Sequence, residues 1–247
     1  MNTTPFFSII TVTYNAEELL QKTIDSIRRQ TFPEIEYIIV DGASKDNTLN
    51  VISQNKDVVT SWVSESDSGI YDAMNKGISI SSGKWINFMN AGDIFCEDTT
   101  LESVAKAIQP DTEVAYGHRY YLRRGERIFQ EAKDISTIYE RMPFGHQSTF
   151  ARSDVLKENK FNSTYKFAAD YDLLMRLYLS DRSFQKINVA ICDFLAGGQS
   201  ESGLRPYLET IKILLDHTKD PETIKNNIYF KTFRSINNKL MDEICGK

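Results

Sequence analysis

The chain has 247 residues, 41% of them hydrophobic and 26% charged, which suits one large α/β domain or such a domain with a helical extension. The formal net charge of −5 and the pI of about 5.4 argue against nucleic-acid binding as the main task. The three cysteines, Cys96, Cys192 and Cys245, form no C-x-x-C pair and favour a reduced, cytosolic setting. No window reads as a signal peptide or membrane span, so we expect a cytoplasmic protein, soluble or at most resting on a membrane surface.

The first hundred residues alternate between strand and helix patterns. We expect strands at residues 6–12, 36–40, 58–64 and 84–90, and helices at residues 19–30, 48–54, 70–81 and 97–108. Strands separated by helices predict a mostly parallel, doubly wound α/β sheet, in which ligands bind outside the carboxyl ends of the strands. Polar clusters follow residues 12, 40 and 88, which are three such ends.

The second half of the chain is less regular. A hairpin is expected at residues 113–130 around Arg124-Gly125, a strand at residues 146–152 and a helix at residues 169–180. From about residue 203 the pattern is helical, amphipathic and charged. We therefore expect one α/β domain at residues 1–202 and a helical C-terminal extension at residues 203–247.

Carboxylates are the candidate functional groups, because the dinucleotide, P-loop and zinc-protease motifs are absent from the sequence. Asp41 directly follows an expected strand in "IIVDGASKDNT". It is read either as part of a helix-capping loop or as an acceptor for the N–H and hydroxyl groups of a nucleoside. Thr13, Tyr14 and Asn15 follow the neighbouring strand, where Tyr14 either stacks on a base or packs. Asp67, after the third strand, is placed to face a ligand.

In the segment "WINFMNAGDIF", residues 85–95, an apolar run ends in Asn90-Ala91-Gly92-Asp93. Read alone, Asp93 is a helix cap or a ligand of Mg²⁺ or Mn²⁺, which take hard oxygen ligands and often use one or two carboxylates plus substrate phosphates. Asp170, in "KFAADYDLLMRL", opens a helix and is either an N-terminal acid or a general base. His146 in "FGHQSTF" is a structural histidine or a site residue.

Together these segments resemble the bacterial family 2 glycosyltransferases with the GT-A fold. The motifs run in the same order over about residues 5 to 200, and they look like those of enzymes that build capsule, exopolysaccharide or O-antigen units. The resemblance implies an inverting transfer from a nucleoside-diphosphate sugar, with a UDP-sugar favoured, to a hydroxyl of a glycan or lipid-linked acceptor.

The resemblance also implies roles for individual residues. Thr13, Tyr14 and Asn15 would border the nucleoside, Asp41 would bind the base and Asp67 would line the nucleotide pocket. Asp93 matches the last acid of the family's metal motif, with Mn²⁺ or Mg²⁺ as the cofactor; Asn90 and Gly92 stand beside it on the donor side. This motif commonly has two or three acids, so we expect metal to bind weakly and mainly together with the diphosphate.

Asp170 matches the family's catalytic base, and His146 and Gln147 match a segment near the acceptor. The glycine-rich segment at residues 194–203 resembles a loop that closes over the donor.

Two alternative functions also involve a nucleotide. A sugar-phosphate nucleotidyltransferase would need a glycine-rich basic loop after the first strand, where "TVTYNAEE" has none. A non-catalytic nucleotide-sugar binding protein would not need Asp170. The C-terminal helices carry basic residues, which could contact anionic lipid at a membrane surface or a second copy of the chain. Acidic residues lie between these basic residues, and they favour a solvated helical face or the homodimer contact over the lipid.

Overall fold

The structure, a computed structural model, describes residues 4–197 and 204–245. Its strands are β1 (Phe7–Thr13), β2 (Ile35–Asp41), β3 (Ser61–Ser64), β4 (Trp85–Phe88), β5 (Ile94–Phe95), β6 (Val114–Arg123), β7 (Glu126–Gln130), β8 (Thr149–Arg152) and β9 (Phe184–Leu195). Its helices are α1 (Glu17–Arg28), α2 (Thr48–Gln54), α3 (Ile70–Ile80), α4 (Thr100–Ala107), α5 (Ser153–Glu158), α6 (Ala169–Leu179), α7 (Arg205–His217), α8 (Pro221–Asn226) and α9 (Ile228–Cys245). Two 3-10 turns, η1 (Ile135–Tyr139) and η2 (His146–Ser148), lie between β7 and β8.

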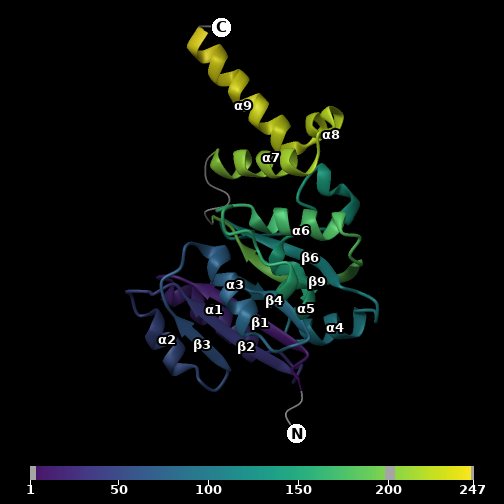
Figure 1. Ribbon diagram of the computed structural model, residues 1–247. Helices are drawn as coiled ribbons and strands as arrows, with labels where there is room; N and C mark the ends of the chain where they lie inside the picture. Colours follow the sequence, from purple (N-terminus) through teal and green to yellow (C-terminus); the bar gives the residue numbers. More distant parts are fainter. Residues whose placement is uncertain (1–3, 198–203, 246–247) are drawn as a thin grey trace.

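One sheet runs through the described chain in the order β3-β2-β1-β4-β8-β6-β9-β5, with β7 paired to β6 (Figure 1). The first four strands are parallel, which confirms the expected βαβ half. The second half is mixed, because β8 runs antiparallel to both β4 and β6. The expected third strand starts late, at Ser61, because the N–H groups of Val58 and Val59 close a turn on the Asn55 carbonyl.

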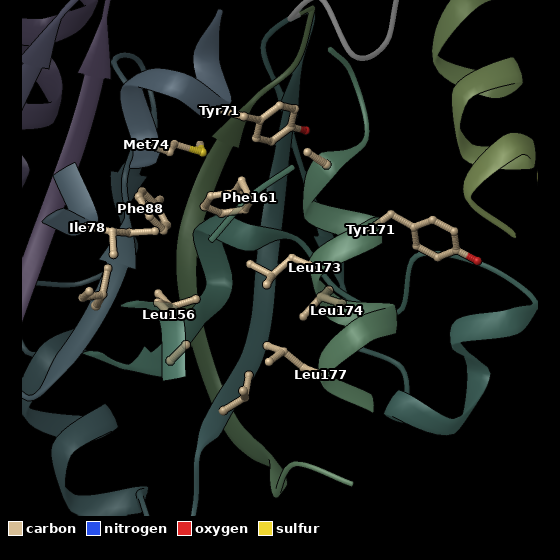
Figure 2. Packing of buried hydrophobic residues seen from close by; sticks show 14 of the residues in the cluster. Tyr71, Met74, Ile78, Phe88, Leu156, Phe161, Tyr171, Leu173, Leu174 and Leu177 are labelled. Carbon is tan, nitrogen blue, oxygen red and sulfur yellow. The ribbon is translucent and has the colours of Figure 1, made fainter. Parts of the chain in front are cut away.

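Each face of the parallel half carries its own apolar core, because neighbouring residues of a strand point to opposite faces. Ile9 of β1 belongs to the core under α1, α2 and α4, while Ile10 belongs to the core under α3 and α6. Figure 2 shows part of the second core, in which Leu173 of α6 lies near Phe161 and Leu177 lies further along the helix. This packing explains the continuous apolar strands and holds α6 against the sheet.

The C-terminal helices stack on the domain through α7. Helix α7 packs on α6, and α9 packs on α7 at its start and then extends away from the body (Figure 1). Within residues 4–197 and 204–245, no helix is both long enough and apolar enough to cross a bilayer.

A buried carboxylate ties the amino-terminal edge of the sheet together. Glu36 of β2, 8% exposed, accepts hydrogen bonds from the Ser8 hydroxyl of β1 and from the N–H and hydroxyl of Ser82. Burial alone would raise the pKa of Glu36, but these hydrogen bonds hold it below its usual value of 4.5. Glu36 therefore contributes stability above about pH 4.5, and this contribution is lost as the pH falls through the lowered pKa.

Replacing Glu36 by glutamine should lower the free energy of unfolding at pH 7 by about 1–3 kcal/mol, since a charged hydrogen-bond acceptor is lost from a buried site. Urea unfolding at pH 7 and pH 3.5 measures this difference, which should shrink at the lower pH. Glu18→Gln, at an exposed position of α1, is the matched control and should leave stability unchanged. An equal loss at both pH values would contradict the ionised state of Glu36.

Candidate active site

Three parallel strands end side by side at the carboxyl edge of the sheet. The strand register pairs Thr13 with Asp41 and Asp41 with Ser64. Side chains that follow these strands are therefore neighbours, as the strand pattern predicts. This edge carries the residues expected to bind the nucleotide.

Asp41 points into the protein. It is fully buried, and its carboxylate accepts hydrogen bonds from the N–H and hydroxyl of Ser44 and from the hydroxyl of Ser64 (2.6 Å). These contacts use both carboxylate oxygens within the chain. Asp41 thus fixes the loop after β2, and its direct contact with a base stays a prediction.

Asp67 and Tyr14 face the space above Gly42. A Cβ atom added to Gly42 would lie 2.5 Å from Asp67 Oδ2 and 3.4 Å from the Tyr14 ring. Asp67 Oδ1 accepts the Gly69 N–H (2.9 Å), and Tyr14 is 59% exposed. Because Gly42 has no side chain, the Asp67 carboxylate and the Tyr14 ring both lie close to this position, just beyond the carboxyl ends of the strands.

Asn15 joins the loops after β1 and β2. Its N–H donates to Ser44 Oγ (2.8 Å), and its Oδ1 accepts the Lys45 N–H (2.8 Å). Its φ of 47° lies in the left-handed region, which asparagine tolerates better than most residues. Asn15 therefore ties the two loops together through both its N–H and its side chain. The neighbouring Thr13 Oγ1 is buried without a hydrogen-bond partner in the described part of the chain.

Asp93 stands in the turn between β4 and β5. It is 4% exposed, and its Oδ1 accepts the Leu195 N–H (2.9 Å) at the start of the glycine-rich loop. Burial raises the pKa of Asp93 to about 6, although Leu195, His146, Gln147 and Arg119 act in the opposite direction.

The turn that carries Asp93 depends on a glycine. Gly92 has a φ of 104°, and its N–H donates to Thr23 Oγ1. The rest of the glycine-rich loop, residues 198–203, lies outside the described residues, as does the expected domain boundary near residue 203.

The oxygens around Asp93 fit a divalent cation that brings further ligands with it. Asn90 Oδ1 is buried without a hydrogen-bond partner in the described part of the chain, so this turn offers one carboxylate and one amide oxygen. Within the same residues, no group of three or more histidine, cysteine, aspartate or glutamate side chains could hold a metal ion. A cation here would take its other ligands from a diphosphate.

Asp170 lies in the first turn of α6 with its carboxylate held on several sides. Its Oδ1 accepts from the Tyr71 hydroxyl (3.0 Å) and from the Tyr171 N–H (3.0 Å), and its Oδ2 contacts His146 Nδ1 (3.0 Å). Burial opposes ionisation, but His146 and the other donors hold the pKa of Asp170 below its usual value. A carboxylate has about four acceptor positions, so one remains for a hydroxyl to be deprotonated.

His146 connects Asp170 to the turn that carries Asp93. Asn90 Nδ2 lies 3.0 Å from His146 Nε2. An amide nitrogen only donates, so Nε2 accepts and Nδ1 donates to Asp170. The structure therefore places His146 between Asn90 and Asp170, with the buried Gln147 beside it.

A residue of α7 supports the start of the helix that carries Asp170. The Glu209 carboxylate accepts the backbone N–H groups of Lys166 (2.7 Å), Phe167 (2.6 Å) and Ala168 (2.8 Å). Ala168 is the N-cap of α6 and has no side-chain cap of its own. Glu209 thus holds the segment that leads into α6 and accepts the N–H of the N-cap residue, which has no partner within the helix.

Three residues of this site were not found from sequence: Tyr71, Arg119 and Glu209. Tyr71 gave a partial signal, since it follows Asp67 and Gly69 in the segment recognised as functional. Arg119 appeared only as part of a hairpin, and Glu209 as one charge of an amphipathic helix. Neither Arg119 nor Glu209 belongs to a local sequence pattern that identifies the residues it contacts.

The sheet and this arrangement of acids define the class of protein, a glycosyltransferase of the GT-A type. The profile described as glycosyl transferase family 2 matches residues 8–174. The chain belongs to this family and is a glycosyltransferase.

Named relatives agree with this. A PGL/p-HBAD biosynthesis glycosyltransferase of Mycobacterium bovis is 32% identical over 180 residues, 70% of each chain. An uncharacterized glycosyltransferase of Methanocaldococcus jannaschii is 25% identical and aligns with 92% of this chain and 84% of its own.

Solved structures share the fold. TarS of S. aureus in complex with UDP superposes with a TM-score of 0.69 at 22% identity, over 85% of this chain and 64% of that one. The match therefore spans less than two thirds of TarS. The mannosyltransferase PcManGT of Pyrobaculum calidifontis, in complex with GDP-Man and Mn²⁺, gives a TM-score of 0.69 at 16% identity, over 94% of this chain and 70% of that one.

Proposed function

We propose that the protein is an inverting glycosyltransferase that moves a sugar from a nucleoside-diphosphate donor to a hydroxyl of a glycan or lipid-linked acceptor in cell-surface polysaccharide synthesis. One observation carries the proposal: Asp170, ionised and partly open, is linked through His146 to Asn90, in the turn that also carries Asp93. A base and a donor-holding turn therefore face one another. Residues 203–247 are an extension that completes this site through Glu209.

In the proposed reaction, Asp170 accepts the proton of the acceptor hydroxyl while the hydroxyl oxygen attacks the anomeric carbon. Tyr71 and His146 keep the carboxylate in place and ionised during the attack. One displacement from the face opposite the diphosphate inverts the configuration. Asp93 and Asn90 would hold Mn²⁺ or Mg²⁺, whose positive charge offsets the charge that develops on the departing diphosphate.

Asp67 is the residue proposed to read the base, and Tyr14 to stack on it. A carboxylate oxygen accepts the N3–H of uracil, whereas N3 of cytosine is itself an acceptor and would be repelled. Guanine also offers an N–H to such an oxygen, so a carboxylate here discriminates UDP from CDP more strongly than UDP from GDP. The UDP found with TarS agrees with this choice.

The test is transfer and hydrolysis with UDP-, GDP-, dTDP- and CDP-sugars in Mn²⁺, with product configuration read by proton NMR. We expect turnover with a UDP-sugar and a β-linked product from an α-linked donor. Retained configuration, or no binding of any nucleotide sugar, would overturn the proposal.

Asp67→Asn should weaken UDP binding at least about tenfold, since it removes a charged acceptor from the base, and should narrow the preference over CDP. Calorimetry with both nucleotides measures this. Glu65→Gln is the matched control, because Glu65 is an exposed acid of the same loop that pairs with Lys76. Equal effects of the two substitutions on UDP binding would argue against base recognition by Asp67.

A further inference from the structure

A large cavity opens beside Asp170. Its volume is about 1070 Å³, and His146 and Asp170 stand in its wall. The other walls come from the β6–β7 hairpin, the start of the loop after β9, and helices α7 and α9. None of the residues assigned above to the donor at the strand ends (Tyr14, Asp41, Asp67) lines it. In the proposed function, this cavity is where the acceptor reaches the base.

Five cations line this cavity and the one beside it, against three carboxylates, those of Glu126, Asp170 and Glu131. Arg119, Arg123 and Arg124 line the large cavity, and Lys133 and Arg141 line an adjoining cavity of about 330 Å³ that shares Arg119. Within residues 4–197 and 204–237, whose side chains the structure describes, none of these five cations forms a salt bridge with a carboxylate.

A paired arginine nearby and the net charge of the chain both set these unpaired cations apart. Arg127 of the same hairpin forms a salt bridge with Asp193 (2.9 Å), so an arginine at this place in the fold can be paired with a carboxylate. The whole chain carries a net charge of −5, so unpaired cations do not gather here through general basicity. Neighbouring cations repel one another unless an anion lies between them.

Arg119 is fixed in place within reach of the base. Its Nε donates to Gln130 Oε1 (2.7 Å), and its guanidinium lies 4.8 Å from the centre of the Phe194 ring. A Cβ atom added to Gly145 would come within 2.2 Å of Arg119 Nη1, so the absence of a side chain at Gly145 makes room for this arginine next to His146. Arg123 and Arg124 are exposed at the hairpin tip and extend the charge outward.

Aromatic side chains also line the cavity. Tyr207 of α7 and Tyr229 of α9 both line the cavity, with ring centres 6.0 Å apart. Partly buried aromatic rings offer apolar faces to sugar rings and a hydroxyl for hydrogen bonds. The cavity therefore combines surfaces for a sugar with charges for an anion.

We propose that the acceptor is a sugar that carries a phosphate or diphosphate, with the anion bound by Arg123 and Arg124 at the hairpin tip and by Arg119 nearer the base. This rests on the proposed function and adds the chemical class of the acceptor. The anion is not consumed; it places the accepting hydroxyl at Asp170. Its source is either a lipid-carried sugar diphosphate or a water-soluble sugar phosphate.

The test measures calorimetric binding of two probes, geranyl diphosphate and inorganic pyrophosphate, to the full chain in EDTA. The double variant Arg123→Gln/Arg124→Gln should weaken binding of the diphosphate group about tenfold, since charge-assisted hydrogen bonds to phosphate are lost. The matched control is Lys22→Gln/Lys56→Gln, two exposed lysines without salt bridges near α1 and α2, which should leave binding unchanged. Added salt should weaken binding to the wild type more than to the arginine variant.

A second arm repeats the titration with UDP and Mn²⁺ at saturation. Binding that persists supports a site separate from the donor site, whereas competition by UDP would place the diphosphate in the donor site and overturn the inference. Absence of binding to the wild type, or equal weakening by both double variants, would also overturn it. Tighter binding of geranyl diphosphate than of pyrophosphate supports the lipid-carried source, and equal binding supports the soluble one. Since the first arm uses no nucleotide, its result is independent of whether the proposed donor is right.

Discussion

Replacing Asp170 by asparagine should lower kcat about 10²–10⁴-fold, the usual contribution of a positioned general base, while donor affinity stays close to that of the wild type. Asparagine keeps an oxygen that can accept from Tyr71 and from the Tyr171 N–H, so the start of α6 should remain in place. The loss would therefore report the missing proton acceptor. Initial rates with saturating donor, together with calorimetric donor binding, separate the two quantities.

Asp181→Asn is the matched control for Asp170→Asn. Asp181 is exposed just beyond the end of α6 and has a φ of 54°, which asparagine adopts readily. It should leave kcat and donor binding unchanged. Turnover of Asp170→Asn within about tenfold of the wild type would mean that another group takes the proton.

Replacing Asp93 by asparagine should remove the dependence of donor binding on Mn²⁺. The amide still accepts the Leu195 N–H, but it lacks the charge that a hard cation prefers. We expect donor affinity in Mn²⁺ to fall about 100-fold, the upper end of what losing a residue around a metal costs. Donor titrations with Mn²⁺ and with EDTA measure it, and the two affinities of the variant should coincide.

Asp111→Asn, at an exposed position without a salt bridge, serves as the control for a lost acidic charge. It should retain the full difference between Mn²⁺ and EDTA. If Asp93→Asn also keeps that difference, the cation is held elsewhere. If the wild type shows no difference, the donor does not need a cation at this turn.

The sequence predicted the parallel half of the sheet and the position of its polar ends because both depend on local patterns. Apolar runs such as Tyr37–Val40 pack against helices on both faces, and the chain turns where those runs stop. The place of Asp170 in the first turn of α6 followed from the leucine spacing after it. These features need no knowledge of distant residues.

The direction of each side chain was harder to predict, because it depends on partners far along the chain. Asp41 turns inward since Ser64, 23 residues later, supplies a hydroxyl in register with it. His146 reaches Asn90 across 56 residues, and Glu209 reaches Ala168 across 41. No periodicity in the sequence records such pairs, which form only after the sheet and helices have packed.

The support that Glu209 gives to α6 limits how this enzyme can be re-engineered. The helix that positions the base begins on a carboxylate from α7, and α7 and α9 also carry Tyr207 and Tyr229 of the large cavity. Swapping the C-terminal segment with that of a relative to alter acceptor choice would therefore disturb proton transfer as well, unless the incoming helix offers an acid at the same place. Acceptor choice and catalysis are therefore linked through the C-terminal segment. New acceptors are better sought at the exposed tip of the β6–β7 hairpin, Arg123 and Arg124, where substitution leaves the contacts of Glu209 with the start of α6 in place.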